Sequence, residues 1–134
     1  MNYLDYAATT PVNPEVLEVI TKEMASFGNP SSVYRIGREQ KQKIERVKKA
    51  ILSELQAAPH DAIIFTSSGS EGNNLVFESI REHFAKEKGH IIVSGVEHPS
   101  VRKPAEFLAE EGFDVTYLAP NKDGIVTVSQ VKEA

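Results

Sequence analysis

The sequence predicts an α/β fold with a mostly parallel sheet covered by helices. Segments with helical apolar spacing alternate with short, nearly continuous apolar runs from residue 59 onward. Apolar residues make up 40% of the chain and charged residues 25%, as in ordinary globular proteins. A length of 134 residues corresponds to one domain or part of one. We expect an extended segment and two helices in residues 1–58, followed by a βαβαβ unit in residues 59–134.

The N-terminal region is predicted to begin extended and then to become helical. Residues 1–12 are expected to be extended, with small side chains at 7–10, and Asn13 is suited to cap a helix whose first residue is Pro14. An apolar stripe predicts that this helix continues toward Gly28. After a polar loop, a second apolar stripe predicts a longer helix over about residues 37–57.

The remaining residues alternate between strand and helix patterns. The predicted order is a strand at 62–66, a polar turn at 67–74, a helix through 84, a strand at 91–94, a helix from 99 to 112 and a strand at 113–118. This order implies right-handed crossovers and helices packed on a parallel sheet. A further helix is expected to start near residue 129, so the predicted domain is incomplete at residue 134.

Composition and charge exclude several classes of function. With 15 Lys and Arg against 19 Asp and Glu, the net charge of −4 lacks the basic character of a nucleic-acid-binding protein. No apolar run approaches the roughly 18 residues of a membrane span. The first residues lack a secretory pattern, so we expect a cytoplasmic protein that does not bind membranes. Because the chain has no cysteine and no histidine pair with metal-ligand spacing, we expect no metal site.

The polar turn after the first predicted strand is a candidate anion site. Backbone N–H groups at a helix start, next to small side chains, suit a phosphate group. Gly69 permits close approach of the backbone to a ligand, and Ser70 offers a hydroxyl. The alternative is that Ser68 or Ser70 merely caps the helix, with Glu71 in its first turn. The segment lacks the lysine of a P-loop and the glycine spacing of dinucleotide-binding folds.

Ser70 also permits a nucleophilic interpretation. Residues 68–72 differ by one residue from the G-x-S-x-G elbow of serine hydrolases. Three histidines, His83, His90 and His98, follow Ser70, as the order of such a triad requires. An elbow normally follows several strands, whereas this turn follows the first predicted one. Hydrolase activity is therefore the lesser alternative.

His98 follows the second predicted strand, where ligands of open α/β sheets collect. Its imidazole is able to stack on an aromatic ligand or to transfer protons near neutral pH. The alternative is a structural histidine at the entry of the helix that begins with Pro99. Lys103 and Lys122 are interpreted as surface residues, so neither is a candidate for covalent chemistry.

Four motifs occur in one order along the chain. They are Tyr-Leu-Asp-Tyr-Ala-Ala-Thr-Thr-Pro at 3–11, Gly-Asn-Pro-Ser-Ser at 28–32, Phe-Thr-Ser-Ser-Gly-Ser-Glu-Gly-Asn-Asn at 65–74 and Glu-His-Pro at 97–99. Together they resemble the N-terminal part of a cysteine desulfurase of the NifS/IscS type, within the class V, fold-type I pyridoxal-phosphate enzymes. The resemblance runs over essentially the whole chain. It implies a partial three-layer α/β/α large domain with a mostly parallel sheet.

The resemblance also implies roles for individual residues. By position, Gly69 and Ser70 bind the 5′-phosphate of pyridoxal 5′-phosphate, while His98 stacks on its pyridine ring and assists catalysis. Residues 7–10 and 29–32 line the substrate side or the neighbouring loop. Members of the family are homodimers that act on L-cysteine. They leave alanine and an enzyme persulfide, whose sulfur serves iron–sulfur clusters or tRNA thiolation.

The chain departs from the family pattern at two positions and in its extent. Tyr34 stands where the family often has histidine, and Ser68 where glycine is common. Later in its longer chain the family supplies a lysine that binds the cofactor, an aspartate paired with the pyridine nitrogen and a nucleophilic cysteine. We therefore expect the chain alone to be inactive, with a C-terminal complement or a sulfur-acceptor scaffold protein as partner. The alternative is a non-catalytic module that pairs with a full-length homologue.

Overall fold

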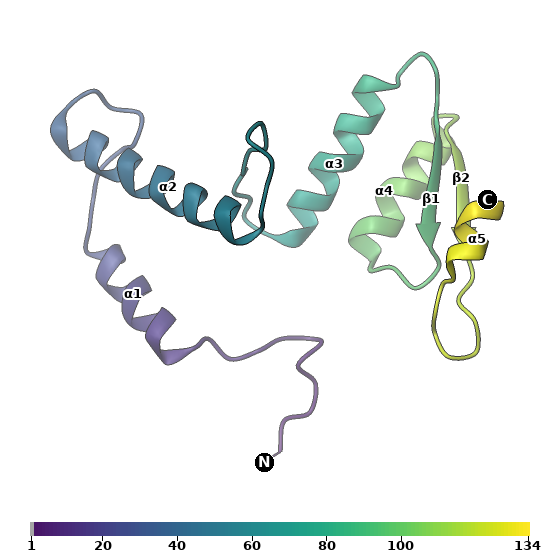
Figure 1. Cartoon of the computed structure of the whole chain (residues 1–134), viewed down its shortest axis with the longest axis horizontal. Coiled ribbons are helices and arrows are strands. Elements are labelled where there is room, and N and C mark those ends of the chain that lie inside the picture. The colour runs from purple at the N-terminus through teal and green to yellow at the C-terminus, as the bar shows by residue number, and fades with distance from the viewer. Residues whose placement is uncertain (1) are drawn as a thin grey trace. The chain divides into compact units, whose positions relative to one another are not determined.

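The computed structural model describes residues 2–134, and these contain five helices and two strands (Figure 1). The chain divides into two compact units, Met1–Ile63 and Ile64–Ala134. Across the described residues, no helix combines the length and apolar character that crossing a bilayer requires. The division into residues 1–58 and 59–134, which the sequence suggests, stays a prediction.

The first unit contains helices α1 (Pro14–Met24) and α2 (Arg35–Glu54). Helix α1 begins where the sequence predicts, because Asn13 caps it: Asn13 Oδ1 accepts a hydrogen bond from the Glu15 N–H at 2.9 Å. It ends earlier than Gly28, and α2 covers a slightly earlier range than residues 37–57. Both shifts lie at helix ends, where fraying makes sequence signals weakest.

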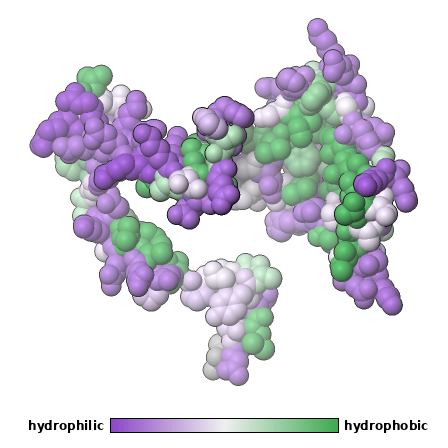
Figure 2. Space-filling view, in the orientation of Figure 1, coloured by the Kyte–Doolittle hydropathy of each residue, from purple (hydrophilic) through white to green (hydrophobic). Residues whose placement is uncertain are grey.

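Polar contacts join the two helices of the first unit. Lys43 Nζ lies 2.7 Å from Glu23 Oε2, and Gln40 Nε2 donates to Ser26 Oγ at 3.0 Å. Apolar side chains of α1 remain exposed, as the hydrophobic colour along this helix shows in Figure 2. Among the described residues of this unit, Gly37 alone is buried. Polar contacts between side chains, rather than an apolar core, therefore hold this unit.

The second unit contains an α/β arrangement. Its elements are α3 (Gly69–His83), β1 (His90–Ser94), α4 (Pro99–Glu110), β2 (Asp114–Leu118) and α5 (Val128–Glu133). Strands β1 and β2 pair in parallel, with His90 opposite Asp114 and Ser94 opposite Leu118. Helix α4 packs on both strands, and α3 packs on α4. The predicted α/β class with a parallel sheet is confirmed.

A small apolar core lies between α4 and the two strands. Its buried residues are Val93, Ala105, Leu108, Phe113 and Leu118. Ala105 and Leu108 are three residues apart in α4, so they lie on one helix face. Burial of these side chains is the main force that holds α4 on the sheet. Because His98 is the N-cap of α4, this core also positions the candidate histidine.

The strand predicted at 62–66 is wrong for this structure. Within the described residues, the sheet contains only β1 and β2, and Ile64 is 73% exposed. A buried-type apolar run becomes a strand only when neighbouring strands accept and donate its backbone hydrogen bonds. The predicted turn at 67–74 is also shorter than expected, because α3 already begins at Gly69.

Candidate functional site

Helix α3 starts with two N–H groups, those of Gly69 and Ser70, that have no acceptor within the described residues. Ser68 is the N-cap: its Oγ accepts from the Glu71 N–H at 3.2 Å, and its carbonyl accepts from the Gly72 N–H at 3.1 Å. Ser68 therefore caps the helix, as one interpretation of the sequence held. The cap nonetheless leaves two donors at the positive end of the helix for an anion.

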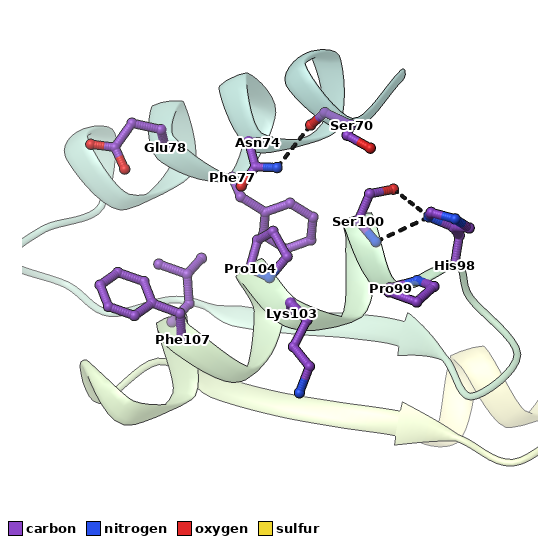
Figure 3. Close-up of a pocket in the computed structure, with 11 residues that line it drawn as sticks. Ser70, Asn74, Phe77, Glu78, His98, Pro99, Ser100, Lys103, Pro104 and Phe107 are labelled. Atoms are coloured by element: carbon purple, nitrogen blue, oxygen red, sulfur yellow. Dashed lines mark hydrogen bonds between the residues drawn. The ribbon is translucent and has the colours of Figure 1, made fainter. Parts of the chain in front are cut away.

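Ser70 adds a hydroxyl at the same place. Its carbonyl accepts from Asn74 Nδ2 at 2.8 Å, but its Oγ makes no hydrogen bond with any residue that the structure describes (Figure 3). A Cβ added at Gly69 would meet no atom within 4 Å, so the space beside the helix start is open. The backbone of Ser70 is α-helical, without the strain of a nucleophile elbow. The geometry thus favours ligand binding over hydrolysis.

Glu71 turns back toward the preceding residues instead of toward the two free N–H groups. Its Oε2 accepts hydrogen bonds from the Ser67 hydroxyl and the Ser67 N–H, both at 2.6 Å. These two bonds, the hydroxyl bond first, hold the pKa of the Glu71 carboxyl below its ordinary value. The carboxylate is therefore held by Ser67 and leaves the N–H groups of Gly69 and Ser70 accessible.

Acid should loosen the start of α3. Because the pKa of Glu71 is lower in the folded chain than in the unfolded chain, its contribution to stability is complete above the unfolded pKa of about 4.3. That contribution is lost as the pH falls through the lower, folded value. We expect amide-exchange protection of Gly72 and Asn73, corrected for intrinsic rates, to fall below about pH 4.3.

Two variants distinguish this local effect from general acid unfolding. Glu71→Gln should lose the pH-dependent part of the protection, while Glu82→Gln, on the same helix, should retain it. The same pH dependence in Glu71→Gln as in the parent chain would show that Glu71 does not stabilise this turn.

His98 is the N-cap of α4 and follows the carboxyl end of β1. Its Nδ1 accepts from the Ser100 N–H at 3.1 Å and lies 2.8 Å from Ser100 Oγ (Figure 3). The structural role considered for His98 is therefore present. The side chain is nevertheless exposed, and Nε2 has no hydrogen-bond partner among the described residues. One edge of the ring is held by the protein and the other is open to a ligand.

A pocket of the second unit brings Ser70 and His98 together. It has a volume of about 600 Å³ and lies between α3 and α4 (Figure 3). The other residues that line it are Asn74, Phe77, Glu78, Pro99, Ser100, Lys103, Pro104, Phe107 and Leu108. Gly69 does not line the pocket, although it is the neighbour of Ser70. Aromatic and proline surfaces beside a few polar groups suit a ligand with a ring and an anionic end.

Several lining residues were not singled out from the sequence. Asn74, Phe77 and Glu78 follow Ser70 at spacings of four, seven and eight, which place them on one helix face. That spacing is a signal from which the wall of the pocket could have been predicted. Lys103 is exposed, as predicted, and its Nζ lies 2.6 Å from Glu106 Oε2. No group of three or more metal-ligating side chains occurs within residues 2–134.

Comparison with known proteins places this α/β chain in a family. Residues 2–134 match the family described as Aminotransferase class-V, and the chain belongs to this family. It is 41% identical to a protein named cysteine desulfurase IscS from Dictyoglomus turgidum, over 98% of this chain and 34% of that protein. It is 37% identical to a mitochondrial cysteine desulfurase from Eremothecium gossypii, over 98% of this chain and 27% of that protein. The chain thus spans between about a quarter and a third of the length of these curated relatives.

Two solved structures are also similar to nearly the whole of this chain and to part of their own length. A structure described as SspA in complex with cysteine matches with a TM-score of 0.90 and 39% identity, over 100% of this chain and 39% of that chain. The structure of DndA from Streptomyces lividans matches with a TM-score of 0.80 and 36% identity, over 98% of this chain and 37% of that chain. These matches support the partial α/β fold.

Proposed function

We propose that the chain forms the phosphate-binding and ring-covering part of a cysteine desulfurase that uses pyridoxal 5′-phosphate. One observation carries the proposal: Ser70 and His98 line one pocket, beside two N–H groups that have no acceptor among the described residues. The family and the names of the relatives support the choice of reaction. The geometry supports the choice of residues.

The residues of the site fit the two ends of this cofactor. A phosphate group would accept hydrogen bonds from the N–H groups of Gly69 and Ser70 and from the Ser70 hydroxyl. The open space beside Gly69 admits such a group. The exposed ring of His98 is available to stack on a pyridine ring. When bound, pyridoxal phosphate supplies an electron-withdrawing ring that stabilises negative charge on the substrate.

The proposal includes a division of labour with residues outside this chain. The chain has no cysteine, so the sulfur removed from L-cysteine must pass to a thiol elsewhere. We propose that a C-terminal complement supplies this thiol together with the covalent lysine and the pyridine-pairing aspartate. Alone, the chain would be inactive. The complete assembly would be a cytoplasmic homodimer that delivers sulfur to an acceptor scaffold for iron–sulfur clusters or tRNA thiolation.

Binding of the cofactor by the chain tests the proposal. We expect calorimetric titration to show pyridoxal phosphate binding, with pyridoxal, which lacks the phosphate, at least about tenfold weaker. Ser70→Ala should weaken the binding of pyridoxal phosphate about ten- to a hundredfold, because a hydrogen bond to a charged group contributes about 1.5–3 kcal/mol. Ser79→Ala is the matched control: its hydroxyl, also on α3, donates to the Leu75 carbonyl at 2.8 Å and lies outside the site. Equal affinity for both compounds would overturn the phosphate assignment.

Reconstitution tests the reaction itself. The chain is mixed with a polypeptide that covers the remaining two thirds of the Dictyoglomus turgidum relative, and sulfide release from L-cysteine is measured with a reducing thiol. We expect release from the mixture and none from either part. Co-elution without sulfide release would instead favour the non-catalytic pairing module.

A further inference from the structure

A chain of hydrogen bonds connects the phosphate-binding helix to His98. Asn73 Nδ2, on α3, lies 2.9 Å from Ser100 Oγ, on α4, and Ser100 Oγ lies 2.8 Å from His98 Nδ1. Asn73 and Ser100 are both partly buried. The bond between Asn73 and Ser100 therefore lies where water competes with it less than at the open surface. Neither residue touches the N–H groups of Gly69 and Ser70 that the proposed function uses.

The hydrogen bond from the Ser100 backbone N–H determines which atom donates and which accepts in the other two bonds. The Ser100 N–H donates to His98 Nδ1 at 3.1 Å, so Nδ1 carries no proton. Ser100 Oγ, 2.8 Å from the same nitrogen, must then donate its own proton to it. The lone pairs of Oγ are left to accept from Asn73 Nδ2. The neutral His98 ring consequently carries its proton on Nε2, at the edge that is free of the protein.

We propose that Asn73 and Ser100 are positioning residues that fix the orientation and tautomer of His98 relative to the start of α3. The assignment of a ligand to the ring rests on the proposed function, but the positioning itself does not. Asn73 lies one turn after Gly69 on α3, so movement of the phosphate-binding turn is transmitted to the ring through two hydrogen bonds. The distance between the phosphate donors and the ring is thereby held before any ligand binds.

Nitrogen-15 NMR of the His98 ring in the full chain, without cofactor, tests this positioning. In the parent chain Nδ1 should show the shift of an unprotonated nitrogen and Nε2 that of a protonated one. Ser100→Ala should reduce the preference for this tautomer about fivefold, because the hydroxyl donor is lost while the backbone N–H remains. Ser100→Thr keeps a hydroxyl and should restore the parent shifts. Ser79→Ala should leave them unchanged.

The double variant separates a connected network from two independent contacts. Asn73→Ala should change the His98 shifts less than Ser100→Ala, since it acts only through the hydroxyl. The variant with both changes should shift no further than Ser100→Ala alone. Parent-like amide signals of Val93 and Leu108 would show that the second unit remains folded in each variant. Additive changes, or parent-like His98 shifts in Ser100→Ala, would overturn the proposal.

A titration with pyridoxal phosphate keeps this inference separate from the proposed function. If the His98 shifts respond to Ser100→Ala but no cofactor binds, the positioning stands and the proposed function fails. If cofactor binds and Ser70→Ala weakens it while Ser100→Ala leaves the ring unchanged, the proposed function stands and the positioning fails.

Discussion

Gly37→Ala should displace the loop that precedes α2. An added Cβ at Gly37 would lie 2.0 Å from Ser32 Oγ and 2.4 Å from the Asn29 carbonyl oxygen, closer than any non-bonded contact allows. The loop cannot yield cheaply, because the same carbonyl accepts from the Ser32 N–H at 3.0 Å and from the Ser32 hydroxyl at 2.7 Å. We expect a loss of about 1–3 kcal/mol, the usual cost of overpacking. Thermal unfolding and the amide shifts of residues 29–32 measure it.

Gly89→Ala is the matched control for this prediction. A Cβ added at Gly89 meets no atom within 4 Å, and its backbone is not left-handed. The same methyl group should therefore be neutral or slightly stabilising there, because alanine restricts the unfolded chain. An unchanged loop in Gly37→Ala would contradict the close packing between α2 and residues 29–32.

Helices were predicted well because their signals are local. The Asn13 cap and the proline after it determine the start of α1, and both lie within a few residues of the helix. The parallel pair β1 and β2 was also recognisable, since each strand is a short apolar run bounded by turns. Residues 62–66 show the same pattern, yet they form no strand here. A strand depends on neighbours elsewhere in a sheet, and that dependence is invisible in its own sequence.

The candidate site was predictable in part for a similar reason. Gly69, Ser70 and His98 each follow an apolar run, which placed them where ligands collect in α/β folds. The connection through Asn73 and Ser100 was not predictable, because these two residues are 27 positions apart and meet only when α3 packs on α4. Local chemistry therefore identified the groups able to contact a ligand. Tertiary packing determines which groups hold them in place.

Leu108→Ala should have the largest effect on stability of the changes considered. Leu108 is 1% exposed and is the largest fully buried side chain in the part of the chain that the structure describes. Its replacement removes apolar contacts and leaves a cavity between α4 and the strands, at a cost of about 2–5 kcal/mol. Small domains are stable by only about 5–15 kcal/mol in total, so the loss is a large fraction. The midpoint of urea unfolding, followed by far-ultraviolet circular dichroism, measures it.

Phe107→Ala is the control, because it removes a larger side chain from the adjacent position of α4. Phe107 is 51% exposed, so its loss should cost clearly less than that of Leu108. The same core carries the site: α4 presents His98 and Ser100, and it remains on the sheet chiefly through Ala105 and Leu108. Leu108→Ala should therefore also broaden the His98 ring signals before global unfolding, whereas Phe107→Ala should not. A parent-like midpoint and parent-like ring signals in Leu108→Ala would mean that contacts with α3, rather than the sheet, position His98.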